Sequence, residues 1–189
     1  LTGGDGGDSL VGGSGDDTYI FNTNDVDSGE TITELSGGGT DAISVVTTTD
    51  FTNMSAASFD EIEKIKFDGA NQTATFLGTQ LNGETIALEE STTGTSNLVI
   101  NMSSGETAVF SNISATSFTS GADTITINGF TGNETITGPN VASTMSGDSG
   151  NDSLIGGEAA DTLSGDIGND NLTGGDGGDS LVGGSGDDT

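Results

Sequence analysis

The chain contains no cysteine, histidine, arginine or tryptophan, and its 189 residues include one proline, one tyrosine and two lysines, Lys64 and Lys66. The absence of cysteine excludes a disulfide framework and thiol chemistry. Without histidine or cysteine, the chain cannot form a Ser-His-Asp or Cys-His nucleophile. Two positive charges against 30 acidic residues exclude the phosphate contacts of a nucleic-acid-binding protein. No stretch approaches the roughly eighteen apolar residues of a membrane-spanning helix.

Acidic residues and glycine are in excess, with a formal net charge of −28 and 33 glycines. Such a composition is typical of disordered chains, but a strict period of nine residues argues against disorder here. From residue 147 the chain divides into GDSGNDSLI, GGEAADTLS, GDIGNDNLT, GGDGGDSLV and GGSGDDT. Each segment begins with glycine and has aspartate at its sixth position, and each complete segment has leucine at its eighth.

Each position of this nine-residue repeat has a physical role. Glycine at the first, second and fourth positions permits tight turns with positive φ. The aspartate and the turn carbonyls offer the oxygen ligands that Ca²⁺ prefers, and the last three residues form a short strand with one inward side chain. One leucine per repeat offsets little of the chain entropy lost on folding. The metal is therefore expected to contribute folding free energy, so that the repeats are disordered without calcium.

The repeat resembles the calcium-binding nonapeptide of the RTX (repeats-in-toxin, hemolysin-type) family. The resemblance implies an all-β chain folded as a right-handed parallel β-roll or β-solenoid, with eighteen residues per turn and several Ca²⁺ ions between repeats two apart on the same edge. It places Asp152, Asp170 and Asp188 along one edge, and Asp161 and Asp179 along the other. The further ligands that it implies, from the first and third positions and from the first two repeats of the chain, are Gly147, Ser149, Gly156, Glu158, Gly165, Ile167, Gly174, Asp176, Gly183, Ser185, Asp8 and Asp17.

Some repeats depart from this pattern. Asp148 and Asp166 replace the second glycine in two of them, and Ala159 replaces the fourth glycine in another. The site that uses residues 156–161 is therefore expected to be strained or weaker. Further upstream, Glu134 and Ser143 stand at the sixth position. The calcium sites are therefore expected to begin at Asp152.

Residues 1–18 recur letter for letter as residues 172–189. This identity indicates near-identical modules in tandem, whose partners are neighbouring modules of the same chain; a cloned or engineered duplication is the alternative. The chain is expected to divide into RTX-like repeats at 1–20, a central solenoid section at 21–128, and a ladder of repeats at 129–189 in which residues 147–189 are the most regular. Asp8 and Asp17 would find same-edge partners in a preceding module, so this end is expected to be only partly metal-bound.

The residues that follow the first two repeats are also acidic. Residues 29–34 and 41–47 are rich in β-branched side chains and predict two short strands. We expect a solvated acidic rim around them, and a capping calcium ion is the alternative. The residues concerned are Asp25, Asp27, Glu30, Glu34 and Asp41.

The central section contains a second duplication, at residues 51–78 and 110–138. FTNMSAASF in the first unit matches FSNISATSF in the second, and IKFDGANQTATFLG matches ITINGFTGNETITG. Each unit is expected to form an apolar loop or short helical turn followed by two strands. Because these units lack the aspartate ligands, an apolar core is expected to stabilise the central section in place of calcium.

The sequence indicates a protein that is not an enzyme. A calcium-dependent β-helical lyase would need a basic residue, and Lys64 and Lys66, flanked by Glu61 and Glu63, fit a paired strand edge better. The family resemblance implies type I secretion to the extracellular space or the bacterial cell surface. We expect a structural module of an adhesin stalk, S-layer or extracellular filament, compatible with lateral self-association. The alternatives are the secretion and folding appendage of an exported enzyme, and a glycan- or ice-binding solenoid with threonines in register.

Overall fold

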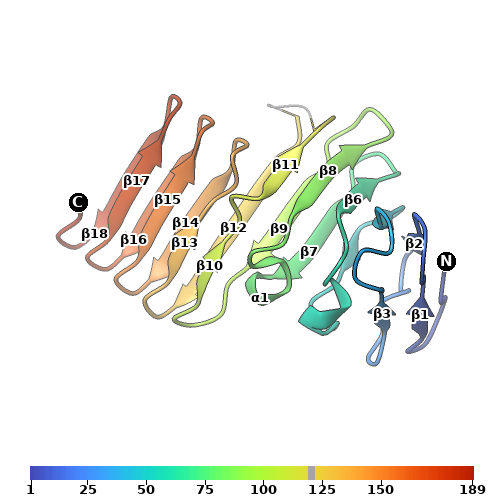
Figure 1. Ribbon diagram of the computed structural model, residues 1–189. Coiled ribbons are helices and arrows are strands. Elements are labelled where there is room, and N and C mark those ends of the chain that lie inside the picture. Colours follow the sequence, from blue (N-terminus) through green and yellow to red (C-terminus); the bar gives the residue numbers. More distant parts are fainter. Residues whose placement is uncertain (119–121) are drawn as a thin grey trace.

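The computed structural model describes residues 1–118 and 122–189 and shows one β-solenoid (Figure 1). All strand pairs in this part of the chain are parallel. The strands stack side by side along the solenoid, and the two termini lie at its opposite ends (Figure 1). The predicted all-β solenoid is confirmed. Within the described residues, no helix has the length and apolar character needed to cross a membrane.

The ladder is built from short strands in two sheets. One sheet contains β12 (Thr124–Thr131), β14 (Thr144–Ser149), β16 (Thr162–Ile167) and β18 (Ser180–Ser185). The other contains β10 (Thr107–Val109), β13 (Thr135–Thr137), β15 (Ser153–Gly157) and β17 (Asn171–Gly175). Thr162 pairs with Thr144 on one side and with Ser180 on the other, eighteen residues away in each direction. The period that the repeat implies is therefore confirmed.

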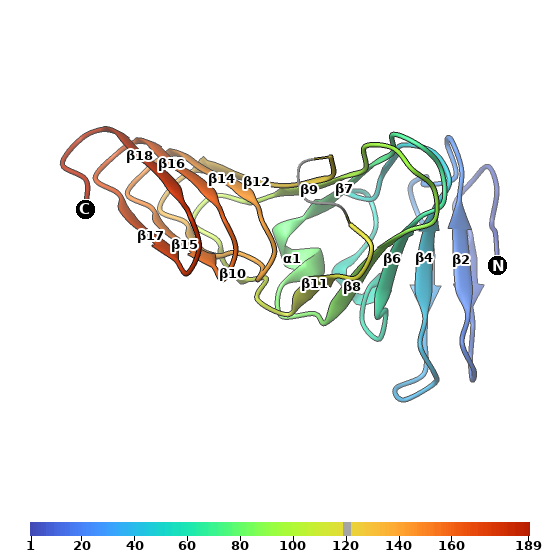
Figure 2. The same ribbon diagram turned by 90° about the horizontal axis from the view of Figure 1, so that it is seen from above.

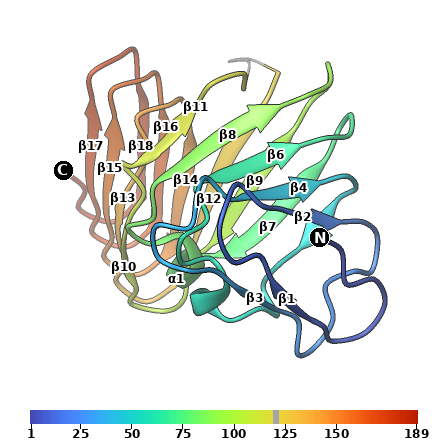
Figure 3. The ribbon, with the colours of Figure 1, turned by 45° about the vertical axis from the view of Figure 1, so that its right-hand side comes forward.

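The central section continues the solenoid with longer turns. The first sheet of the ladder extends through β9 (Asn97–Asn101), β7 (Thr73–Leu77) and β5 (Thr49–Asp50). A five-stranded sheet, whose members lie side by side in Figure 3, contains β11 (Ile113–Ala115), β8 (Ile86–Glu90), β6 (Lys64–Phe67), β4 (Ala42–Val45) and β2 (Thr18–Phe21). Ala42 pairs with Lys64, and Asn97 pairs with Thr124, so each of these turns contains more residues than a turn of the ladder.

The N-terminal end has its own small sheet. Strands β1 (Ser9–Val11) and β3 (Thr31–Thr33) pair in parallel, with Ser9 opposite Thr31. The strands predicted at 29–34 and 41–47 are therefore present, as β3 and β4. The chain between β1 and β3 forms one complete turn of the solenoid.

An aromatic core fills the widened central section. Phe51 stacks on Phe76 at a ring-centroid distance of 4.7 Å and meets Phe21 and Phe59 edge-on at 5.1 and 6.1 Å. All four rings are buried. The short helix α1 (Gly78–Leu81) lies between the sheets at this level (Figure 2). The ladder, which narrows in the same view, buries Leu154 and Leu163, whereas Leu172 is half-buried and Leu181, near the end of the stack, is exposed. This contrast agrees with the expected division between apolar and calcium-dependent stabilisation.

The two duplicated units are alike only in their second halves. Residues 65–78 contain β6 and β7, and residues 125–138 contain β12 and β13, so the strand–turn–strand pattern is present in both. The expectation of an apolar loop or helical turn is right for 51–59, which contains the 3₁₀ turn η1 (Ala56–Ser58), and wrong for 110–118, which contains β11.

The physical reason for the difference is the set of contacts available to each segment. Strand β11 pairs with β8, the next member of its sheet. Residues 51–59 bury Phe51, Met54 and Phe59 instead, and the Gln80 side-chain amide donates hydrogen bonds to the carbonyls of Phe51 and Met54, each at 2.8 Å. Residues 119–121 of the second unit lie outside the described residues.

Candidate metal centre

The sixth-position aspartates of the ladder form two columns along the solenoid, each residue standing directly before a strand. In each column the backbone N–H of one residue donates to the Oδ1 atom of the aspartate one turn later. Asp152 donates to Asp170 at 2.8 Å, Asp170 to Asp188 at 3.0 Å, and Asp161 to Asp179 at 3.0 Å. The structure therefore brings together the aspartates that the family resemblance assigns to the same edge.

The second oxygen of each buried carboxylate is left unpartnered. Asp152, Asp161 and Asp170 are each 2 % exposed, and the Oδ2 atom of each is buried without a hydrogen-bond partner among the described residues. This oxygen faces the first-position glycine of its own repeat: a Cβ atom on Gly156 would lie 2.6 Å from Asp161 Oδ2. Glycine at the first position therefore leaves space beside the unpartnered oxygen.

No side-chain cation neutralises these carboxylates. The two lysines of the chain lie on β6, outside the ladder, and Lys64 pairs with Glu89 at 3.1 Å. Burial, together with the neighbouring carboxylates of Glu134 and Asp170, raises the pKa of Asp152 to about 6. Buried oxygen donors without nitrogen or sulfur ligands suit a hard divalent cation, because its charge offsets the desolvation of the carboxylates. The residues present therefore fit Ca²⁺.

Comparison with known families agrees with this geometry. A family model of the RTX calcium-binding nonapeptide repeat matches the chain in four copies, at residues 1–22, 128–163, 142–172 and 155–189. The two ends of the chain therefore match the RTX repeat, and residues 23–127 lie outside the match. The RTX repeats bind calcium, which supplies positive charge at the aspartate columns when it is bound. No curated protein gave a match, and no solved structure did.

The second position of the RTX repeats requires positive φ. Gly157 and Gly175 have φ of +154° and +101°, and the two aspartates that replace glycine there, Asp148 and Asp166, have +68° and +69°. Aspartate is one of the few residues that adopt this conformation without severe strain. Ala159, which replaces the fourth-position glycine, does not have positive φ. The strain expected for residues 156–161 is therefore not found in its backbone.

The third-position residues hold the turns together through their carbonyls. The carbonyl oxygens of Ser149, Ile167 and Ser185 accept hydrogen bonds of 2.8 to 2.9 Å from fourth-position glycines one turn earlier. An accepting carbonyl retains a second lone pair, so these atoms keep the capacity to bind calcium. Together with the carbonyls of Glu158 and Asp176 and of the first-position glycines, they stay predicted ligands. At the end of the stack, the carboxylates of Asp179 and Asp188 are half-buried.

Upstream of Asp152 the sixth-position residues are already satisfied. Glu134 is buried, and its two carboxylate oxygens accept the N–H groups of Gly105 at 2.6 Å and Phe130 at 3.2 Å. Ser143 donates its hydroxyl to Asp161 Oδ1 at 2.9 Å. Neither residue has a buried unpartnered oxygen. The start of the calcium sites at Asp152 stays a prediction, because Glu106 Oε1, further upstream, is also buried without a partner among the described residues.

At the N-terminal end, Asp8 and Asp17 do have partners within this chain, contrary to expectation. The Asp8 N–H donates to Glu30 Oε2 at 2.9 Å, and the Asp17 N–H to Asp41 Oδ1 at 2.8 Å. The series that begins with Asp17 and Asp41 continues one turn further, because the Asp41 N–H donates to Glu63 Oε2 at 2.7 Å. Turns longer than those of the ladder bring these acids into register although the nine-residue repeat has ended. Sequence reasoning missed Glu63, whose only signal is its position directly before a strand.

Three of the five acids that were expected in a solvated rim are buried, so the expectation is wrong for them. Glu30 is 2 % exposed and Asp41 1 % exposed, and Asp25 is buried with Oδ2 accepting the N–H of Asn22. Asp27 is exposed, as expected. Glu34 is half-buried, and its carboxylate oxygens lie within 4.8 Å of those of Asp17 and Asp41.

Two hydrogen-bond donors contact the Glu34 carboxylate. Its oxygens accept the Tyr19 hydroxyl and the Gly13 N–H. Burial and the Glu34 carboxylate raise the pKa of the Tyr19 hydroxyl, which keeps the tyrosine protonated as the donor.

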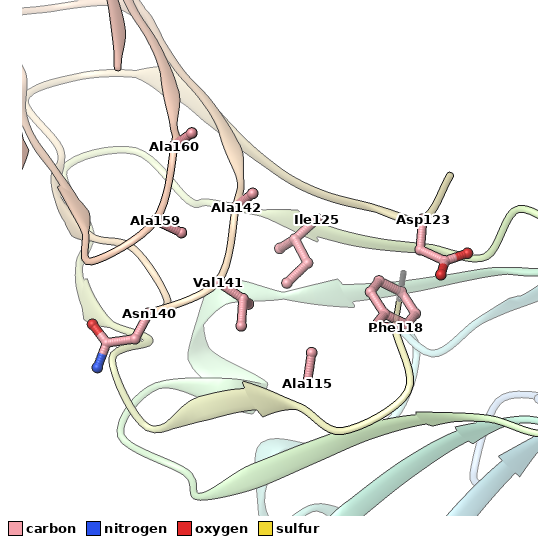
Figure 4. A pocket seen from close by; sticks show the side chains of 9 residues that line it. All are labelled: Ala115, Phe118, Asp123, Ile125, Asn140, Val141, Ala142, Ala159 and Ala160. Carbon is pink, nitrogen blue, oxygen red and sulfur yellow. The ribbon is translucent and has the colours of Figure 1, made fainter. Parts of the chain in front are cut away.

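A pocket lies where the ladder meets the central section (Figure 4). It has a volume of about 310 Å³ and is lined mainly by small and apolar side chains, among them Ala142, Ala159 and Phe118. Its one carboxylate, Asp123, accepts the Ser96 N–H at 2.8 Å. This described lining offers no nucleophile–base pair.

One short row of outward threonines is the pair of Thr107 and Thr135, and another contains three threonines. Thr144 pairs with Thr126 and Thr162 in register, and the row ends at Val99 and Ser180. The adjacent row contains Asn128, Ser146 and Ser164 instead of threonine. The threonines therefore do not form the extended array that a glycan- or ice-binding face would require.

Replacement of Gly165 by alanine is expected to abolish calcium binding at Asp170. The added Cβ atom would clash with Asp170 Oδ2 and would lie 2.6 Å from the carbonyl oxygen of Gly183 on the next turn. We expect a loss of about 2–3 kcal/mol in the free energy of unfolding of the calcium-bound ladder, measured by denaturant titration. Gly178→Ala is the matched control, because a Cβ atom there meets nothing within 4 Å and the residue does not need positive φ. Equal effects of both changes would contradict the role of the first-position glycine.

Acidification is expected to stabilise the calcium-free protein. The pKa of the Asp152 carboxyl is about 6 in the folded chain, above its usual value of 3.8. Between these two pH values the folded chain therefore binds more protons than the unfolded chain. In calcium-free protein, whose ladder is unfolded at pH 7, the β signal of the ladder in circular dichroism should therefore grow as the pH falls from 7 to 4, and be lost again as the pH is raised. Calcium-bound protein should show the opposite trend, because protons displace the metal. Asp152→Asn should flatten the calcium-free profile, and an unchanged profile would contradict the assignment.

Proposed function

We propose that the chain is a calcium-stabilised structural module of a secreted protein in which such modules follow one another in tandem. In this role the module is a rigid spacer of an adhesin stalk, S-layer or extracellular filament. The proposal includes export in the unfolded state through a type I system, followed by folding at the bacterial cell surface or outside the cell, where calcium is abundant. The chain itself would carry out no reaction.

The observation that carries this proposal is the identity of residues 1–18 and 172–189. Both copies use the same turn conformations. Gly4, Gly6, Gly13 and Gly15 have φ of +89°, +103°, +98° and +106°, and their counterparts Gly175, Gly177, Gly184 and Gly186 have +101°, +120°, +105° and +140°. A second module placed on the first through this shared segment would continue the same solenoid. An enzyme appendage does not require such an identity.

A two-module protein tests the proposal. It consists of residues 1–189 followed by a second copy of residues 19–189, so that the shared segment occurs once at the junction. Small-angle scattering in calcium is expected to show one rigid rod of about twice the length of a single module. The matched control joins two copies of residues 1–189 through a flexible glycine–serine linker. A direct fusion as flexible as this control would overturn the spacer role and favour the secretion and folding appendage of an exported enzyme.

A further inference from the structure

Glu30 is a buried carboxylate that lies outside the segments matched by the RTX family model. It is 2 % exposed, and its Oε2 atom accepts the N–H of Asp8 at 2.9 Å. Its other oxygen, Oε1, is buried and has no hydrogen-bond partner among the described residues, and the same is true of Asp8 Oδ2. Unpartnered buried carboxylate oxygens are costly in the absence of a positive charge.

The pair Asp8 and Glu30 repeats the arrangement of the ladder pair Asp152 and Asp170. In both pairs the N–H of the first acid donates to one carboxylate oxygen of the second, at 2.9 and 2.8 Å. In both pairs one oxygen of each acid stays buried and unpartnered. The first-position glycine also takes the same place, because a Cβ atom on Gly3 would lie 2.7 Å from Asp8 Oδ2.

The longer glutamate side chain matches a longer turn. The turn that leads from Ser9 to its partner Thr31 contains more residues than the ladder turn that leads from Ser153 to its partner Asn171. The additional residues form the connection that leads to β3. Glutamate is one methylene longer than aspartate and still delivers its carboxylate to the Asp8 N–H.

No positive side chain lies within reach to balance this pair. Both lysines are on β6, in a different sheet, and the N-terminal ammonium donates to the carbonyl of Thr18 on β2. The surroundings add further negative charge instead, since Asp27 Oδ2 accepts the nearby Gly6 N–H at 2.9 Å. A site with oxygen donors alone and a negative field selects a hard divalent cation.

We propose that Asp8 and Glu30 bind a divalent cation, Ca²⁺ under extracellular conditions, between the first RTX repeat and the turn that precedes β3. This site uses a glutamate that belongs to no nonapeptide, and it joins the start of β1 to the start of β3 within the N-terminal sheet. It depends on the contacts within this chain and not on the presence of neighbouring modules.

The number of calcium ions bound per chain tests the site, counted by equilibrium dialysis and elemental analysis. Glu30→Gln and Asp8→Asn should each bind one ion fewer than the unchanged protein, and the double variant should also bind one fewer, because the two residues share a single site. Asp60→Asn, which removes an exposed carboxylate outside both columns, is the charge-matched control and should bind the full number. A full complement of ions in folded Glu30→Gln would overturn the proposal.

Hydrogen exchange of the unchanged protein provides a test that needs no variant. Transfer from calcium to chelator should speed exchange of the amides in β1 and β3 by about tenfold or more, as expected when a local stabilising ligand is removed. Exchange in β4 and β6 should change much less. Equal exchange of β1 and β3 in both media, while the ladder responds to calcium, would show that Asp8 and Glu30 bind no cation even if the variants fail to fold.

Discussion

Removal of calcium is expected to unfold residues 147–189 while the central section stays folded. The ladder contributes only two fully buried leucines to the core, Leu154 and Leu163. Its buried Asp152, Asp161 and Asp170 carboxylates repel one another without a cation. Loss of the bound metal therefore removes the main term that offsets the chain entropy of these turns. The central section does not share this dependence, because the rings around Phe51 give it an apolar core.

Circular dichroism and segment-resolved hydrogen exchange in excess chelator measure this difference. Part of the β signal should disappear, and the lost protection should map to β15, β16, β17 and β18 and not to β4, β6 and β8. Re-addition of Ca²⁺ should restore both signals, whereas Mg²⁺ should restore them poorly, because it requires a smaller octahedral site. A ladder that keeps its protection in chelator would contradict the calcium dependence.

Phe51→Ala is expected to destabilise the central section by about 3–5 kcal/mol, the usual cost of removing a fully buried ring. Phe51 is 0 % exposed and contacts three other rings, Phe21, Phe59 and Phe76. Its removal leaves a cavity that the surrounding parallel strands cannot close without breaking register. Urea denaturation in chelator isolates this effect, because the ladder is then already unfolded.

Phe130→Ala is the control for the loss of a phenyl ring, since Phe130 is 52 % exposed on β12. It should change the free energy of unfolding by no more than about 0.5 kcal/mol. Similar effects of the two changes would mean that the aromatic cluster does not stabilise the central section. In calcium, Phe51→Ala should leave the number of ions bound in the ladder unchanged, which separates the apolar source of stability from the metal-dependent one.

The parts of the fold that were predictable are those that repeat locally. Glycine, aspartate and leucine at fixed positions of a nine-residue unit specify a turn, a ligand and an inward side chain. The resemblance of this unit to the RTX repeat then implies the eighteen-residue period and the columns through Asp152 and Asp161. The alternation of Ile65 with Phe67, and of Ile125 with Ile127, likewise identifies strands whose inner faces are buried.

The contacts that were missed join residues in turns of irregular length. The pairing of Asp8 with Glu30 and of Asp41 with Glu63 depends on how many residues each connection contains, and no local pattern encodes this number. An acidic residue before a strand looks like solvated surface until its register is known. The same reason explains why residues 110–118 contain β11 while the similar residues 51–59 contain the 3₁₀ turn η1, because the outcome depends on the strand available for pairing.

The shared eighteen-residue segment also bears on how a gene for such modules can change. A genetic exchange between two copies, at any point within the segment, rejoins the chain with the same residues at every position. Since the turns of both copies have matching backbone conformations, the recombined protein keeps the register of its strands. In the tandem array that we propose, the number of modules would therefore change in whole units without altering the residues at any junction, so that length would become a heritable variable separate from structure.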